Sequence, residues 1–152
     1  RADAAKLING WQQEGKVVIV DRYVYSNIGY QCAKMESGEA RTTLRDWILD
    51  MEYSQFGIPR PDLSLFLDVP FAFTERKLRE VREGEDRAYL NGGKDIHESS
   101  LDLQRRVREV YLEAAEAYDD LKVVNCSAED GSMATPDAIY ERIMEHVAPL
   151  IG

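Results

Sequence analysis

Three short apolar runs, separated by segments with helical periodicity, constrain the fold more than any other feature of the sequence. The runs cover residues 17–20, 63–69 and 121–124; most of their residues are apolar, and the run at 17–20 is apolar on both faces. Strands of that kind are typical of parallel sheets, which helices cover on both faces. We therefore predict one α/β domain over residues 1–152, a three-layer parallel sheet with helices on both faces.

Apolar residues at helical spacing mark the segments between these runs. Helices are predicted over about 2–14, from about 25, over 39–56, 71–83, 99–118 and 135–147. Ser26 is a candidate N-cap, Ser99 with Asp102 resembles a capping box, and Thr135 followed by Pro136 is a typical helix start. Pro70 closes the second run and opens the next helix. Residues 83–98 have no usable periodicity and predict a loop.

Polar residues follow each predicted strand, where open α/β sheets bind their ligands. These residues are Asp21-Arg22, Asp68-Val69-Pro70 and Asn125-Cys126-Ser127. Arg22 has a planar fork suited to a phosphate, and it lies just before a helix N-terminus, which also favours anions. Asp21 is suited to Mg²⁺, held through water. The other interpretation is an Asp–Arg pair that only ties a strand to a helix.

The helix after Arg22 carries polar side chains that suit a nucleotide. Three of them share one face by their spacing, and these are Asn27, Tyr30 and Gln31. The Asn27 amide both donates and accepts, which suits N3–H and O4 of a pyrimidine. Ser26 lies beside this face. The strand end and this helix therefore favour a phosphate-containing ligand over a purely structural Asp–Arg pair.

The charge distribution narrows the ligand class. A net charge of −9 argues against a general nucleic-acid binder. Nine of the 19 Lys and Arg residues nevertheless fall between Arg76 and Arg108, which fits either a small anionic ligand or an exposed helix with Glu–Arg pairs. No apolar run approaches the ~20 residues that span a bilayer, so no membrane association is expected. Cys32 and Cys126 form no CxxC pair and predict two free buried thiols in a reducing cytoplasm.

Three ordered segments resemble the thymidylate kinase family, and together they cover nearly the whole chain. DRYVYSNIGYQ at 21–31 is similar to the family's DRY/DRH…S…AYQ signature. PDLSLFLDVP at 61–70 resembles its PDLTLYLDVP strand, and QRRVREVYL at 104–112 resembles its RVRxxYLEL helix. The resemblance implies a P-loop kinase fold, ATP as phosphoryl donor, dTMP as acceptor, Mg²⁺, and a homodimer.

The resemblance also implies roles for individual residues. Arg22 would bind the dTMP phosphate, Asp21 would organise Mg²⁺, Asn27 would meet the thymine edge with support from Ser26, and Tyr30 would lie under the deoxyribose. Arg1 would read thymine O4. The further substrate-binding candidates are Gln31, Arg106 and Tyr111. The candidates for contacts to ATP are Arg79, Arg82, Arg87, Asn125, Cys126 and Ser127, and Arg82 and Arg87 are also catalytic candidates. A lid loop is expected over 84–98.

A phosphate-binding loop of the form GxxxxGK[ST] is expected in such a kinase. The segment GWQQEGKV at 10–17 is only superficially similar, because it ends a helix and has Val17 in place of the hydroxyl residue. We therefore expect the loop and the first strand to lie before Arg1, which would leave the run at 17–20 without a neighbouring strand. The 152-residue chain alone is then expected to be unstable or inactive. A deoxynucleoside kinase of the same fold and an inactive nucleotide-binding fragment are the alternatives.

Overall fold

A parallel pair of strands lies at the centre of the molecule. The computed structural model describes residues 2–84 and 93–152, and the side chains of 4–80 and 100–152. Strand β1 (Ser64–Asp68) pairs with β2 (Leu121–Asn125), so that Ser64 lies opposite Leu121 and Asp68 opposite Asn125. Both strands therefore end at the same edge. Beyond them, the Cys126 amide donates to the Asp68 carbonyl at 3.0 Å, which continues the pairing by one residue.

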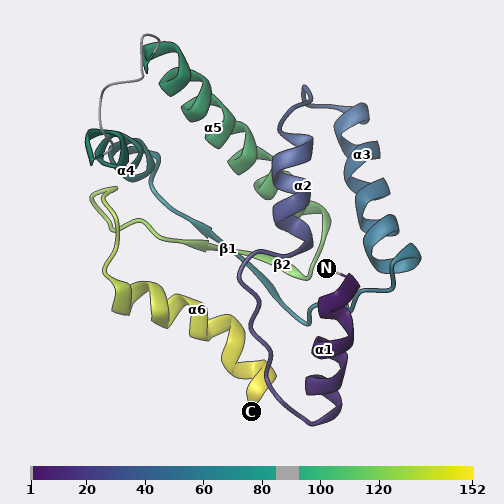
Figure 1. Cartoon of the computed structure of the whole chain (residues 1–152). Helices are drawn as coiled ribbons and strands as arrows, with labels where there is room; N and C mark the ends of the chain where they lie inside the picture. Colours follow the sequence, from purple (N-terminus) through teal and green to yellow (C-terminus); the bar gives the residue numbers. More distant parts are fainter. Residues whose placement is uncertain (1, 85–92) are drawn as a thin grey trace.

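Helices surround this strand pair. Along the chain they are α1 (Ala2–Gln13), α2 (Val24–Cys32), α3 (Glu39–Asp50), the π-helical segment η1 (Met51–Gln55), α4 (Phe71–Gly84), α5 (Gly93–Ala117) and α6 (Pro136–Ile151). Figure 1 shows α2 and α5 on one side of the strands and α6 on the other, while α4 and α5 belong to the connection between β1 and β2. The described residues thus confirm an α/β arrangement with a parallel sheet.

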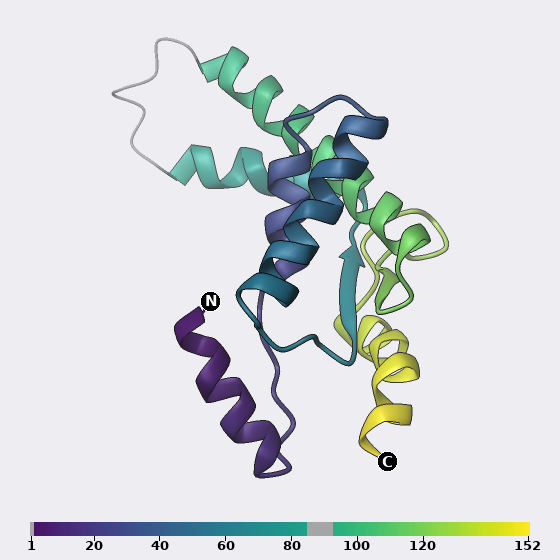
Figure 2. The ribbon, with the colours of Figure 1, turned by 90° about the vertical axis from the view of Figure 1, so that its right-hand side faces the viewer.

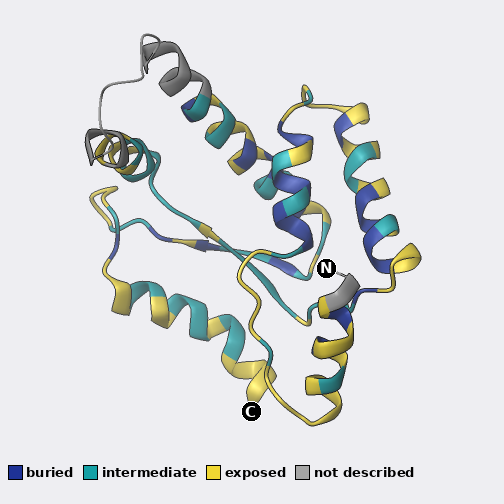
Figure 3. Ribbon diagram, viewed as in Figure 1, coloured by how far each residue is buried: buried dark blue, intermediate teal, exposed yellow. Residues whose placement is uncertain are grey.

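The hydrophobic core lies mainly between α2, α3, α5 and the strands (Figure 3). Its least exposed members include Val24, Ile28, Val110 and Leu121, each at most 2% exposed. The two cysteines, Cys32 and Cys126, are free and buried, as the sequence predicted. Among the described helices, none is long and apolar enough to cross a membrane.

The predicted strand at 17–20 is wrong. This segment is extended but pairs with no strand in the described part of the chain, and it links α1 to α2 away from β1 and β2 (Figures 1 and 2). Val17 is 69% exposed and Ile19 91% exposed. A strand needs a neighbour both for its backbone hydrogen bonds and to cover its apolar side chains.

Two predicted helix starts are also wrong. Helix α2 begins at Val24 with Tyr23 in the N-cap position, so Ser26 lies inside the first turn and is buried. Helix α5 begins at Gly93, so residues 93–98 are helical and Ser99 lies within the helix and not at its start. The rest of the predicted loop, 85–92, lies outside the described residues. By contrast, Thr135 caps α6 as predicted, because its Oγ1 accepts from the Ala138 amide at 3.3 Å.

Candidate functional site

Arg22 has an unusual backbone conformation at the start of the candidate site. Its φ of 65° lies in the left-handed region, and it is the one non-glycine residue with positive φ in the described chain. Such a conformation costs of order 1–3 kcal/mol and is often found at functional sites. Arg22 is followed by Tyr23 and then by the first turn of α2, so the backbone turn places its side chain along that helix.

The side chain of Arg22 is held against α2 by two contacts. Its Nε donates to Ser26 Oγ at 2.9 Å, and its Cζ lies 5.1 Å from the centre of the Tyr30 ring. The hydrogen bond to Ser26 uses Nε and not the two terminal nitrogens. The guanidinium is therefore oriented by its neighbours while its outer edge stays available for an anion.

A cleft of about 320 Å³ lies beside Arg22. Its walls come from α2, the end of β1, the beginning of α4 and one face of α5. The lining residues are Arg22, Ser26, Tyr30, Phe66, Leu67, Asp68, Val69, Phe71, Thr74, Gln104, Val107, Arg108 and Tyr111. Four of the predicted site residues therefore line one cleft at the carboxyl end of β1: Arg22, Ser26, Tyr30 and Tyr111.

Tyr111 joins the cleft to the core. Its ring stacks on Phe66 with a centroid distance of 4.3 Å and an angle of 6° between the planes. A Cβ at Gly29 would lie 2.8 Å from Tyr111 Cε2, so α2 approaches α5 this closely because residue 29 is glycine. Burial raises the pKa of Tyr111 against the opposing effects of Ser26 and Arg22, so its phenol is neutral at pH 7.

Arg108 and Asp68 form a two-pronged ion pair in the wall of the cleft. Arg108 Nε donates to Asp68 Oδ1 at 2.6 Å, and Nη2 donates to Oδ2 at 2.7 Å. From this helix Arg106 was predicted as a site residue, whereas Arg108 was not. The missed signal is the spacing of Gln104, Arg108 and Tyr111, which places them on one helical face.

Asn27 does not line this cleft. Its Nδ2 donates to Glu52 Oε1 at 3.2 Å, which links α2 to η1. Glu52 is only 2% exposed and was not among the predicted site residues. It lies four residues after the buried Ile48, so its place on the apolar side of a helical segment was a readable signal.

Several other predicted residues lie away from the cleft. Asp21 and Gln31 are exposed, and Gln31 Oε1 accepts from Lys34 Nζ at 3.0 Å. Arg106 pairs with Asp102 at 2.9 Å, and Arg79 pairs with Glu75 at 2.5 Å. One pair lies in α5 and the other in α4. Both agree with the alternative interpretation of the basic segment, in which exposed helices carry Glu–Arg or Asp–Arg pairs. Arg1, Arg87 and the side chain of Arg82 lie outside the described residues.

The predicted ATP-binding residues 125–127 form a turn after β2. Asn125 Oδ1 accepts from the Ser127 amide at 2.8 Å, and Cys126 is fully buried. Arg142 of α6 donates Nη1 to the carbonyls of Asn125 at 2.6 Å and Ser127 at 2.9 Å. The turn is therefore held in place by its own backbone and by α6, at the same edge of the sheet as the cleft.

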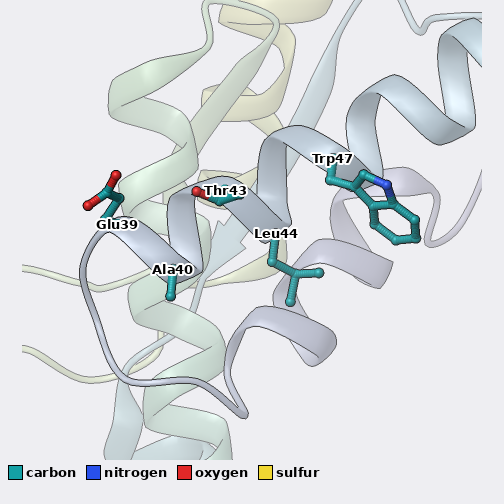
Figure 4. Close-up of a pocket in the computed structure, with 5 residues that line it drawn as sticks. All are labelled: Glu39, Ala40, Thr43, Leu44 and Trp47. Carbon is teal, nitrogen blue, oxygen red and sulfur yellow. The ribbon is translucent and has the colours of Figure 1, made fainter.

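A second, open cleft of about 560 Å³ contains none of the predicted residues (Figure 4). It is lined by Glu39, Ala40, Thr43, Leu44 and Trp47, all from α3. A surface made by one helix offers no convergent polar groups, so the cleft beside Arg22 is the better candidate site although it is smaller. Among the described residues no group of three or more His, Cys, Asp or Glu side chains could by itself hold a metal ion.

The fold and the site together define an α/β protein with a cleft at the carboxyl end of a parallel sheet, lined by Arg22 and Arg108. Residues 1–135 match the family model described as Thymidylate kinase, and the chain belongs to the thymidylate kinase family. That family has the P-loop kinase fold, with which the helices and the small parallel sheet agree.

Curated relatives carry the same family name. The chain is 35% identical over 139 residues to a "Probable thymidylate kinase" of Pyrococcus abyssi, a match covering 91% of this chain and 55% of the relative. It is 31% identical over 147 residues to a "Probable thymidylate kinase" of Thermococcus kodakarensis, covering 97% and 59%. A "Thymidylate kinase" of Mycobacterium tuberculosis is 33% identical over 116 residues, covering 76% and 51%. The chain thus spans about half the length of these relatives.

Proposed function

We propose that the protein carrying this chain transfers the γ-phosphoryl group of ATP to dTMP, giving ADP and dTDP. The observation that carries the proposal is the guanidinium of Arg22, held by Ser26 and Tyr30 beside the cleft with its outer edge available. Membership of the thymidylate kinase family supports the choice of dTMP as acceptor. The acceptor phosphate would lie on Arg22, and the Tyr30 ring would lie under the sugar.

The reaction needs little covalent chemistry from the protein. A phosphate monoester is largely ionised at pH 7, so an oxygen of dTMP attacks the γ-phosphorus without a general base, and ADP leaves. Catalysis then comes from positioning and from positive charge near the phosphoryl oxygens. Arg22 would supply one such charge at the acceptor.

In this region Mg²⁺ would be bound by one or two carboxylates, together with water molecules and phosphate oxygens. Asp21 is an exposed carboxylate next to Arg22 and is the residue we assign to it. When bound, Mg²⁺ neutralises charge on the transferring phosphates. We also propose, from the family resemblance, that Arg79, Arg82, Arg87 and the turn at 125–127 serve ATP, that Gln31 and Arg106 assist the acceptor, and that the protein is a homodimer.

The comparison of dTMP with thymidine as acceptor tests this function. With ATP and Mg²⁺ and the protein at its full natural length, we expect release of ADP with dTMP and a rate at least about 100-fold lower with thymidine. Thymidine as the better acceptor would identify a deoxynucleoside kinase instead. No turnover with either acceptor would favour an inactive nucleotide-binding protein.

Two arginine variants test the role of Arg22. Lysine lacks the planar fork, so Arg22→Lys is expected to raise KM for dTMP by about 10-fold to 100-fold. Arg45→Lys is a matched control, because Arg45 also lies over a tyrosine ring, with its Cζ 5.0 Å from the centre of Tyr118. Unlike Arg22, it contacts Asp46 and Tyr118 and does not line the cleft. An equal change of KM in both variants would refute the assignment.

A further inference from the structure

The cleft beside Arg22 contains a second arginine to which the proposed function gives no role. Of the residues that line this cleft in the described chain, Arg22 and Arg108 carry a positive charge and Asp68 carries a negative one. A phosphate monoester bears a charge of about −1.5 to −2 at pH 7. Arg22 alone therefore leaves part of that charge unbalanced, and Arg108 is the other cation that the lining offers.

Tyr111 relates the two arginines to each other in space. Burial raises the pKa of Tyr111, while Ser26 and Arg22, which lie near its phenol, act to lower it. Arg108 precedes Tyr111 by three residues on α5, and residues three apart are neighbours on one face of a helix. Both arginines therefore lie near the same tyrosine in the wall of the cleft, one from α2 and the other from α5.

Asp68 holds the Arg108 guanidinium by one edge. Nε and Nη2 of Arg108 donate to the two carboxylate oxygens of Asp68 at 2.6 Å and 2.7 Å, so Nη1 is not part of this pair. The Asp68 side chain is 16% exposed, whereas that of Arg108 is 45% exposed. The carboxylate is thus the anchored partner at the end of β1, and the guanidinium extends from it toward solvent.

A fixed guanidinium is better suited to an anion than a freely moving one. A long side chain loses rotamer freedom when it binds a ligand, and a partner that already holds it reduces this cost. Hydrogen bonds from a guanidinium to phosphate oxygens are also among the stronger ones in proteins. The other interpretation is that the Asp68–Arg108 pair only ties β1 to α5. The two interpretations differ in one measurable respect, because only the first involves the phosphate of a ligand.

We propose that Arg108 is a second phosphate-contacting residue of the cleft and binds the phosphate of the acceptor nucleotide together with Arg22. The inference rests on the proposed function, in which the acceptor phosphate lies on Arg22. It gives the phosphate site one cation from α2 and one from α5. The contact of these two helices would then determine the distance between the two charges.

The test compares the binding of dTMP and thymidine by calorimetry, using the protein at its full natural length. Thymidine lacks the phosphate, so the ratio of its dissociation constant to that of dTMP measures the phosphate contacts. We expect Arg108→Gln to lower this ratio about 10-fold by weakening the binding of dTMP alone. Arg76→Gln is the control, because it removes an ion-paired arginine of α4 that does not line the cleft in the described chain. It should leave the ratio unchanged.

A second variant and a stability measurement separate this role from a structural one. Arg108→Lys keeps the charge without the planar fork, so it should lower the ratio by about 3-fold, and it decides the question if Arg108→Gln does not fold. A lower urea midpoint with an unchanged ratio would overturn the inference and leave the pair as a tie between β1 and α5. Equal weakening of dTMP and thymidine, or an equal effect of Arg76→Gln, would also overturn it.

The unsubstituted protein distinguishes this inference from the proposed function. If it binds dTMP no more tightly than thymidine, the phosphate site on Arg22 is refuted, and the proposed function fails with it. If it prefers dTMP and the Arg108 variants keep that preference, the inference about Arg108 alone is overturned.

Discussion

Replacing Gly29 by alanine probes the contact that joins the candidate site to the core. The added Cβ would lie 2.8 Å from Tyr111 Cε2, while ordinary carbon contacts begin near 3.4 Å. The ring must therefore retreat by about 0.6 Å. It cannot do so freely, because the ring also stacks on Phe66 at a centroid distance of 4.3 Å.

Two opposing effects set the magnitude. Alanine is favoured over glycine in a helix by about 1 kcal/mol, whereas overpacking costs about 1–3 kcal/mol. We expect Gly29→Ala to lower the free energy of unfolding by about 0–2 kcal/mol. Gly10→Ala in α1 is the matched control, because a Cβ there would meet nothing within 4 Å. It should be stabilising by up to about 1 kcal/mol.

Urea unfolding followed by circular dichroism measures both variants. The difference between them isolates the packing cost, which we expect to be about 1–3 kcal/mol in favour of Gly10→Ala. Because the displaced ring also lines the cleft, dTMP should bind more weakly to Gly29→Ala. Equal stabilisation by both substitutions would refute the close approach of α2 to Tyr111.

Three further predictions concern Arg22, a buried arginine and the alkaline limit of stability. Ser26→Ala removes the acceptor for Arg22 Nε, so KM for dTMP should rise by about 2-fold to 10-fold as the guanidinium loses its fixed position. Glu113→Gln removes the countercharge of Arg41, whose side chain is 5% exposed, and should lower the free energy of unfolding by about 1–2 kcal/mol in a urea titration. Burial raises the pKa of Tyr53 from 10.0 to about 12, so the unfolded state loses this proton first and stability should fall as pH rises from about 10 through about 12. Tyr53→Phe should reduce that fall and change stability at pH 8 by less than about 1 kcal/mol, because the phenol oxygen has no hydrogen-bond partner among the described residues.

Each of these has a control or a contradicting result. Glu116→Gln changes an exposed carboxylate on the same helix as Glu113 and should leave the urea midpoint unchanged. A Ser26→Ala enzyme with unaltered KM would show that Arg22 keeps its position without the hydroxyl. An alkaline unfolding profile that is identical in Tyr53→Phe would mean that other buried groups, such as Tyr25, whose pKa is also raised by burial, account for the whole effect.

The sequence alone determined the elements whose formation depends on local pattern. The apolar runs that became β1 and β2, the helical periodicity of α3, α4 and α6, and the Thr135 cap could all be read from neighbouring residues. The polar positions that follow Arg22 on α2 could be read in the same way. This is why the sequence sufficed to predict Arg22, Ser26 and Tyr30 as neighbours in one site, and the three side chains do lie together.

Tertiary structure decided what depends on a partner distant in the sequence. Residues 17–20 have the composition of a strand, yet no strand in the described chain pairs with them. Without backbone hydrogen bonds to a neighbour, and with its apolar side chains exposed, the segment is not stabilised as a strand. The rotation of α5 against β1 decides which of its arginines lines the cleft. In the structure Arg108 lines it, whereas Arg106 pairs with Asp102. Likewise the contact between Glu52 and Asn27 depends on where η1 meets α2, because packing decides a hydrogen bond between residues this far apart in the sequence.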